Sequence, residues 1–287
     1  MSKTVEVYKS NALMEASYRL TPSEQGIILS CISQIRKDEN VTDQTMYTVS
    51  VSEYVALTNA DPISAYRDIK AAAIRLRNRE VRIYNPPNVR GGRQKKNRTL
   101  VAGWVQSISY QDKEGVVELR FNHDMLPYLT NLSKNFTKYA FKHVAKMSSS
   151  YGIRLYEILI QWIGEGKEEN EVSVEWLKKT FQLESKYKVM KDFKKYVLQP
   201  AIADIKKHSD LRIEWDQRKT GRRITHLTFK FSLKSKKTKQ ERTELTFQGV
   251  RKSIIDQKAK PGESYEQAAR RIKASAHQKQ KNKNETA

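Results

Sequence analysis

Apolar residues recur at helical spacing in two widely separated segments of the chain. The segments Ser23–Ile35 and Ser149–Ile163 each carry a glycine near the start, Gly26 and Gly152, followed by apolar residues three or four positions apart. Both therefore predict a packed helix.

These helices belong to a longer internal repeat. Each copy reads as helix, short helix, longer helix, strand, basic loop and strand, and three helices followed by a hairpin is the order of a winged helix-turn-helix. We predict an α+β fold of two tandem winged-helix domains, 1–125 and 126–235. Three segments match in the same order at an offset of about 125 residues: Ser23–Ile35 with Ser149–Ile163, Val49–Thr58 with Val172–Thr180, and Leu76–Asn85 with Lys206–Asp216.

The second copy ends in a predicted hairpin. Leu211, Ile213 and Trp215 alternate with polar residues, the segment 226–233 does likewise, and the glycine-containing stretch DQRKTGRRIT lies between them. This pattern is typical of two paired strands, with a basic turn at the tip.

The first copy differs in its loops. Its longer helix is predicted to start with Asp61 as N-cap and Pro62 at the first helical position. The strand that follows enters a long loop, 85–99, with five basic residues and no acid, and segments 100–110 and 115–122 read as paired strands. The connection 123–147 is predicted to be mostly helical.

The charge is strongly positive and continues to the C-terminus. Lys and Arg total 54 against 32 acidic residues, a net +22 with a pI near 9.9, which favours polyanionic partners, nucleic acid ahead of an anionic membrane. The segment 236–287 holds 14 basic and 6 acidic residues with few apolar ones. We expect it to be largely disordered, with a short helix over 264–275.

Several classes of protein are disfavoured. No stretch has the apolar length of a membrane span, and the N-terminus has no apolar signal-peptide core. The single cysteine, Cys31, excludes an internal disulfide. We expect a cytoplasmic protein with no membrane partner.

Catalytic motifs are also missing. The five histidines form neither a His-x-His pair nor an HExxH motif, and GEGKEE is not a P-loop. The acidic residues are scattered, with no DxD-like pair on a predicted strand. We expect a non-enzymatic protein with no catalytic residue, no metal and no cofactor.

The helix predicted over 187–208 carries the main candidate site. One face is apolar, and the opposite face has the donors and acceptors that a helix in a DNA major groove needs. A solvated charged face is the alternative, but a third helix followed by a basic hairpin tip favours DNA. The predicted contacts are Lys188, Lys191, Asp192, Lys194, Lys195 and Gln199, with Arg218, Lys219, Arg222 and Arg223 at the tip. Pro200 lies inside this helix and is expected to bend it.

The corresponding helix of the first copy is lighter in charge, so a dimerisation or scaffold role is the alternative there. Its loop is expected to contact phosphates, which positions a protein without reading sequence. The predicted DNA-binding residues are Ser64, Arg67 and Lys70 on the helix, and Arg90, Arg93, Lys95, Lys96 and Arg98 in the loop.

Three stretches carry a family resemblance: NALMEASYRLTPSEQGIILSCISQI, FTKYAFKHVAKMSSSYGIRLYEILIQW, and YKVMKDFKKYVLQPAIADI with LRIEWDQRKTGRRITHLTFKF. Over roughly residues 5–234, the chain resembles the plasmid replication initiator (Rep) family of theta-type origins. The resemblance implies monomers that bind directly repeated sequences (iterons) in double-stranded DNA and open the origin. By position, it places base and phosphate contacts at Lys191, Asp192, Lys194 and Lys195.

The resemblance also implies partners. Dimers joined through the first domain would repress the protein's own gene, and monomers would meet the host initiator and the replicative helicase, with chaperones converting dimers to monomers. A transcriptional repressor with the same fold and a nicking replication enzyme are the alternatives.

Overall fold

The computed structural model describes residues 5–36, 39, 41–58, 60–85, 98–111, 114–234, 246–260 and 262–284. The chain divides into two compact units, Met1–Lys234 and Ser235–Ala287, which are described separately.

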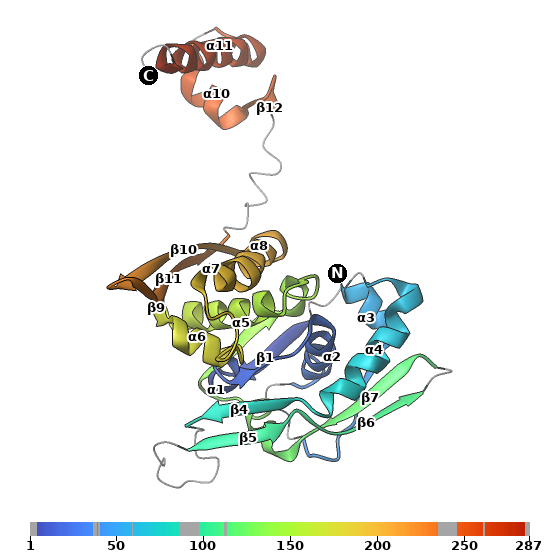
Figure 1. Ribbon diagram of the computed structural model, residues 1–287. Helices are drawn as coiled ribbons and strands as arrows, with labels where there is room; N and C mark the ends of the chain where they lie inside the picture. The colour runs from blue at the N-terminus through green and yellow to red at the C-terminus, as the bar shows by residue number, and fades with distance from the viewer. Residues whose placement is uncertain are drawn as a thin grey trace. The chain divides into compact units, whose positions relative to one another are not determined.

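The first winged-helix domain is built from three helices and a three-stranded antiparallel sheet in the order β3-β7-β6 (Figure 1). Its elements are α2 (Pro22–Ile32), β3 (Tyr47–Ser50), α3 (Val51–Thr58), α4 (Pro62–Leu76), β6 (Val105–Gln111) and β7 (Val116–Phe121).

The second winged-helix domain has the same connectivity, with an antiparallel sheet in the order β10-β11-β9. The predicted pair of tandem winged-helix domains is therefore confirmed. The elements are α5 (Ser150–Gly164), β9 (Glu169–Ser173), α6 (Val174–Thr180), α7 (Met190–Phe193), η3 (Lys194–Leu198), α8 (Gln199–His208), β10 (Leu211–Thr220) and β11 (Arg223–Leu233).

The two glycines of the repeat mark close helix contacts. A Cβ on Gly152 would lie 3.3 Å from the carbonyl oxygen of Ala201, so α5 packs tightly on α8. A Cβ on Gly26 would lie 2.7 Å from a ring carbon of Tyr54 on α3. Each glycine thus lets the first helix of its copy approach a neighbouring helix.

One match of the repeat was wrong. It paired β4 (Glu80–Tyr84) with β10, but β4 pairs with β5 (Thr99–Gly103) and β2 (Ser17–Tyr18) in a separate sheet. The topological partner of β10 is β6, since β6 and β7 form the hairpin beside β3. Alternation reports only that a segment is a strand, so it could not choose between them. The strands β4 and β5 on either side of residues 86–97 therefore belong to this separate sheet and not to the wing, and residues 86–97 themselves lie outside the described residues.

The connection 123–147 is also not mostly helical. It contains β8 (Phe136–Ala140), which pairs antiparallel with β1 (Glu6–Ser10), between the short 3₁₀ turns η1 (His123–Tyr128) and η2 (Phe141–His143). The short helix α1 (Asn11–Met14) follows β1 directly. Strand β8 forms by pairing with β1, which lies about 130 residues earlier in the chain. No local sequence pattern shows such a pairing.

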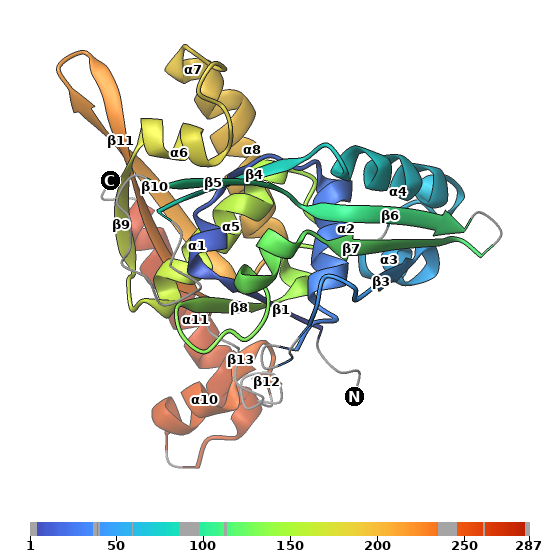
Figure 2. The same cartoon turned by 90° about the horizontal axis from the view of Figure 1, so that it is seen from below.

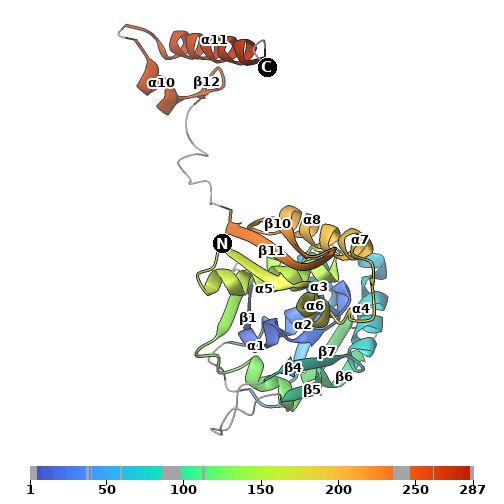
Figure 3. The same cartoon turned by 60° about the vertical axis from the view of Figure 1, so that its left-hand side comes forward.

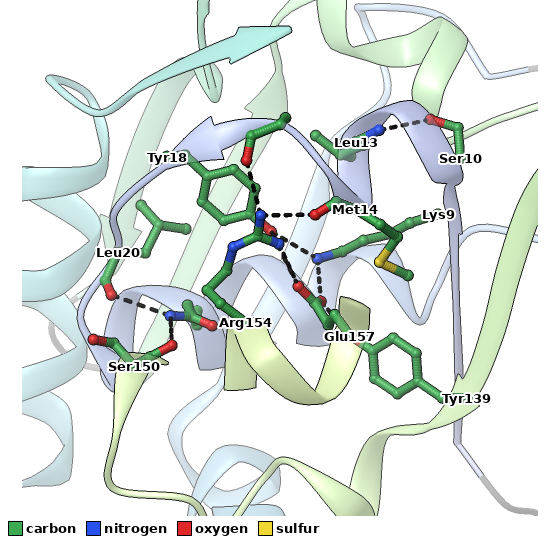
Figure 4. Close-up of polar contacts among 12 residues, drawn as sticks. Lys9, Ser10, Leu13, Met14, Tyr18, Leu20, Tyr139, Ser150, Arg154 and Glu157 are labelled. Carbon is green, nitrogen blue, oxygen red and sulfur yellow. Dashed lines mark hydrogen bonds and ion pairs between the residues drawn. The ribbon is translucent and has the colours of Figure 1, made fainter. Parts of the chain in front are cut away.

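Both winged-helix domains share one hydrophobic core, and a buried polar cluster lies within it (Figure 4). Lys9 on β1 and Arg154 on α5 both contact the carboxylate of Glu157 on α5, Arg154 at 2.7 Å. The hydroxyls of Tyr18 and Tyr139 donate to the same carboxylate at 3.1 and 2.6 Å. All three charged side chains are at most 2% exposed.

The C-terminal unit has its own small core. It comprises β12 (Thr246–Phe247), β13 (Val250–Arg251), α10 (Lys252–Lys258) and α11 (Tyr265–Asn284), packed around Ile255, Ala268 and Ala269. The sequence predicts a largely disordered tail with one short helix over 264–275. Among the described residues, α11 is longer than that helix, and the hairpin β12–β13 and the helix α10 are present as well. None of the helices in the described ranges is long and apolar enough to cross a membrane.

Candidate nucleic-acid interface

The predicted helix over 187–208 begins at Met190, three residues later than predicted, and is three segments rather than one. α7 leads into η3, a wider π-helical turn, and α8 begins at Gln199, directly before Pro200. Proline has no N–H to donate, and its ring crowds the carbonyl four residues back, here that of Tyr196. A π turn in front of Pro200 relieves both problems without ending the helix.

The start of this composite helix is held by α6. Lys178 donates from Nζ to the carbonyl oxygen of Tyr187 at 2.8 Å, and Tyr187 itself has the left-handed φ of +50°. Partial burial lowers the pKa of Lys178. This contact sets the direction in which α7 leaves the loop.

The composite helix buries one face and exposes the other, as its pattern predicted. Three of the predicted contacts on this helix, Lys191, Lys195 and Gln199, are exposed, and so is Lys188 just before its start. The buried side chains are Phe193, Val197, Leu198, Ala201, Ile202 and Ile205.

Two further predicted residues of this helix are less exposed. Asp192 and Lys194 are half-buried, and Lys194 Nζ donates to Gln217 Oε1 of β10 at 3.3 Å. Lys194 thus connects the helix to its wing, whereas Lys191 and Lys195 project from it.

One exposed aromatic residue escaped the sequence prediction. Tyr196 is 51% exposed and stacks on Tyr187 at 6.2 Å between ring centroids, with an interplanar angle of 28°. Lys195 Nζ lies 4.9 Å from the centre of the Tyr196 ring. The sequence signal for this residue was an aromatic side chain among the polar positions on the exposed face of the predicted helix.

The wing formed by β10 and β11 carries the predicted basic tip. Gly221 has the left-handed φ of +59° that the turn requires, and Lys219, Arg222 and Arg223 are exposed around it. Arg218 differs because it donates twice to the Glu171 carboxylate on β9, at 2.8 and 2.7 Å. This hydrogen bonding lowers the pKa of Glu171 and offsets the charge of Arg218.

In the first domain, α4 begins as predicted. The Asp61 carboxylate accepts from the backbone N–H groups of Ile63 and Ser64 at 3.4 and 3.1 Å, and Pro62 is in the first turn. A hydrogen bond from the Ser64 side chain, together with these two backbone hydrogen bonds, lowers the pKa of Asp61. The cap fixes the first turn of α4 firmly.

Arg67 and Lys70 on α4, both predicted DNA-binding residues, already have partners within the domain. Ser64 is half-buried, and Arg67 lies 3.3 Å from Asp68 with its side chain 81% exposed. Lys70 Nζ lies 4.0 Å from the ring centre of Tyr110 on β6, a cation–π contact that connects α4 to its wing.

The first wing is not basic in its described residues. Its hairpin β6–β7 carries Glu114 near the tip, and Glu118 accepts from Ser109 Oγ at 2.8 Å. Of the predicted loop residues, Arg98 is exposed at the start of β5. The remaining four, Arg90, Arg93, Lys95 and Lys96, lie outside the described residues.

The two candidate reading helices share one side of the first unit. α4 and the α7 end of the composite helix lie along the same edge in two orthogonal views (Figures 2 and 3). Both can therefore face one ligand surface together.

Two further features of the described residues are the placement of their potential metal ligands and the environment of Cys31. Groups of three or more His, Cys, Asp or Glu side chains placed to hold a metal ion do not occur in the ranges that the structure describes. Burial raises the pKa of the Cys31 thiol, which makes it a poor nucleophile.

Curated relatives share the sequence pattern over most of the chain. A replication initiation protein of Escherichia coli is 29% identical over 243 residues, 81% of this chain and 71% of its own length. The PI protein of Escherichia coli is 26% identical over 255 residues, 80% of this chain and 84% of its own.

A solved structure and two family models extend the comparison. The crystal structure of Pi initiator protein in complex with iteron DNA has the same fold, with a TM-score of 0.66 at 21% identity over 82% of this chain and 100% of that chain. Residues 6–160 match the family model "Initiator Replication protein, WH1" and residues 173–231 match "Initiator Rep protein, WH2". The chain therefore belongs to the initiator replication protein family, with two tandem winged-helix domains.

Proposed function

We propose that this protein initiates plasmid replication by binding directly repeated origin sequences, or iterons, in double-stranded DNA. The observation that carries the proposal is the pair of exposed lysines, Lys191 and Lys195, on a recognition helix, with exposed Lys188 just before its start and a basic wing beside it. Membership of the initiator family supplies the biological context, and the shared fold of the Pi initiator, which was solved with iteron DNA, supports the choice of ligand.

The arrangement supports a division of labour between contacts. Lysine can donate to guanine acceptors or to phosphate, and Gln199 can pair with adenine because its amide group both donates and accepts hydrogen bonds. Lys219, Arg222 and Arg223 lie on a projecting hairpin, where they would contact phosphates and hold the register.

Two recognition helices on one side of the unit suggest a two-turn site. One helix per major groove, on turns about 10.5 bp apart, predicts a repeat of roughly 20 bp. We include in this proposal the predicted domain boundary after residue 125, which separates the two winged-helix domains that would each read one groove.

The monomer is proposed to open the origin and recruit the helicase in the bacterial cytoplasm, on plasmid DNA. A dimer joined through the N-terminal domain is proposed to repress the protein's own gene. The host initiator and chaperones are proposed as partners on the basis of the family alone.

Binding to the DNA that flanks the gene tests the proposal. We expect the full-length protein to bind a direct repeat in that DNA at least about 10³-fold more tightly than random DNA at about 150 mM salt. An equal affinity for both would refute sequence-specific binding. Protection of a lone inverted repeat over a promoter, with no direct repeat bound, would instead favour a repressor without a replication role.

A further inference from the structure

An isoleucine stands almost fully in solvent at the start of the first recognition helix. Ile63 is 93% exposed, directly after Pro62 in the first turn of α4. The packed side of α4 is made by other residues, Ala65, Ile69, Ala72, Ala73 and Leu76. Ile63 therefore contributes nothing to the core of the domain.

Its position is the one from which a recognition helix reads bases. Residues near the N-terminus of such a helix reach the base edges of the major groove. Helical spacing places Ile63 in one row with Arg67 and Lys70, four and seven residues later. The cap on Asp61 orders this turn before any ligand binds, so little backbone freedom is lost on binding.

We propose that Ile63 contacts the 5-methyl group of a thymine in the DNA repeat and makes the first domain selective for that base. Thymine is the base that presents a methyl group in the major groove, and an apolar side chain with no donor or acceptor can discriminate there by that group alone. A β-branched side chain suits this role because it has few rotamers to lose. The inference rests on the proposed function, since it names a base read by the same interface.

The net charge of the chain favours DNA over a second copy of the chain as the partner of Ile63. Asp61 and Asp68 offset the cations nearest to Ile63, and Arg67 lies 3.3 Å from Asp68, so the local charge is balanced. The chain as a whole carries a net charge of +22, so two copies repel each other while DNA attracts each of them. The net charge of the chain therefore complements a polyanion.

A substitution cycle between protein and DNA tests the proposal. Each thymine of the repeat is replaced singly by deoxyuridine, which removes the 5-methyl group and keeps the hydrogen-bonding edge. Binding of the full-length wild type and of Ile63→Ala is measured for every duplex. At one thymine, we expect deoxyuridine to weaken the wild type about fourfold, the value for one buried methyl group, and to leave Ile63→Ala unchanged.

Ile74→Ala is the matched control because Ile74 is exposed on the same helix, 51%, but three turns from its start. It should show the wild-type response at every thymine. Thermal denaturation of Ile63→Ala should match the wild type, since the side chain packs on no core residue.

The outcomes separate the inference from the function on which it rests. Wild type that prefers the repeat, with the same response to deoxyuridine at every thymine in Ile63→Ala, overturns the thymine contact and leaves the proposed function standing. Loss of self-association in Ile63→Ala with an unchanged thymine response overturns it in favour of a second copy. A wild type with no preference for the repeat refutes both.

Discussion

The two winged-helix domains have the same connectivity but present different outer faces. The second exposes lysines along α7–α8 and a basic tip on β10–β11, whereas the first exposes Ile63 on α4 and carries acidic residues on β6–β7. In the first domain Lys70 is engaged by Tyr110. One fold thus supports a surface suited to phosphates and another suited to apolar contact.

The arginines near the end of α4 show where some of the first domain's charge goes. Glu24 on α2 has a fully buried side chain and accepts from Arg75 at 3.0 Å and from Arg79 at 3.0 Å. Buried charges need such partners, so these cations hold α2 and α4 together. A basic residue on a recognition helix is not thereby a DNA contact.

Removing the charge shared between the domains should have the largest effect. Glu157→Gln leaves Lys9 and Arg154 buried without their carboxylate, and losing one partner of a buried pair costs about 3–5 kcal/mol. We expect that loss in the free energy of unfolding, measured by urea denaturation. Glu184→Gln, on an exposed residue, is the control and should change stability by no more than about 0.5 kcal/mol. A loss below about 1 kcal/mol in Glu157→Gln would contradict the role of the cluster.

The same carboxylate predicts the response to acid. Burial alone raises the pKa of Glu157, but the charges of Lys9 and Arg154 outweigh it and lower the pKa to about 2. A depressed folded-state pKa stabilises the protein above the unfolded-state pKa of about 4.3, and this contribution is lost as the pH falls toward about 2. Between pH 5 and pH 2.5, wild type should lose more stability than Glu157→Gln in parallel urea titrations. Equal losses would show that other groups control acid unfolding.

Truncating the lysines of the second recognition helix should weaken DNA binding more than truncating the arginine of the first. We expect Lys191→Ala and Lys195→Ala each to weaken binding to the repeat by about 1–3 kcal/mol, if each lysine reads a base. Arg67→Ala on α4 should cost less, because Arg67 already pairs with Asp68. Fluorescence anisotropy with repeat and random duplexes measures both. An effect of Arg67→Ala larger than that of Lys191→Ala would reverse the comparison.

Neutralising the wings should have the smallest effect, visible mainly in the salt dependence. Each phosphate contact contributes about 0.9 to the slope of log affinity against log salt. Arg222→Gln and Arg223→Gln should each lower the slope by about that amount, for repeat and random DNA alike. Glu114→Gln on the first wing is the matched variant and should not lower it. An unchanged slope in both arginine variants would remove the second wing from the interface.

Much of this architecture was predictable because it follows from local periods. The helical spacing of Phe193, Val197 and Ala201 identified the buried face of the composite helix, and alternation identified β10 and β11. The chemistry of Asp61 and Pro62 placed the start of α4. Burial follows period in these segments because one face of each must leave water.

The tertiary structure decided which strands pair and which charges remain available. Nothing local shows that β6 and not β4 forms the first wing, or that β8 pairs with β1, because such pairing depends on partners far away in sequence. From the sequence alone, Arg218 and Lys191 are equally good candidates for DNA contact. In the structure, Arg218 is bound to Glu171, whereas Lys191 is exposed on the recognition helix. A side chain's charge is fixed by its identity, but its use depends on what the fold places beside it.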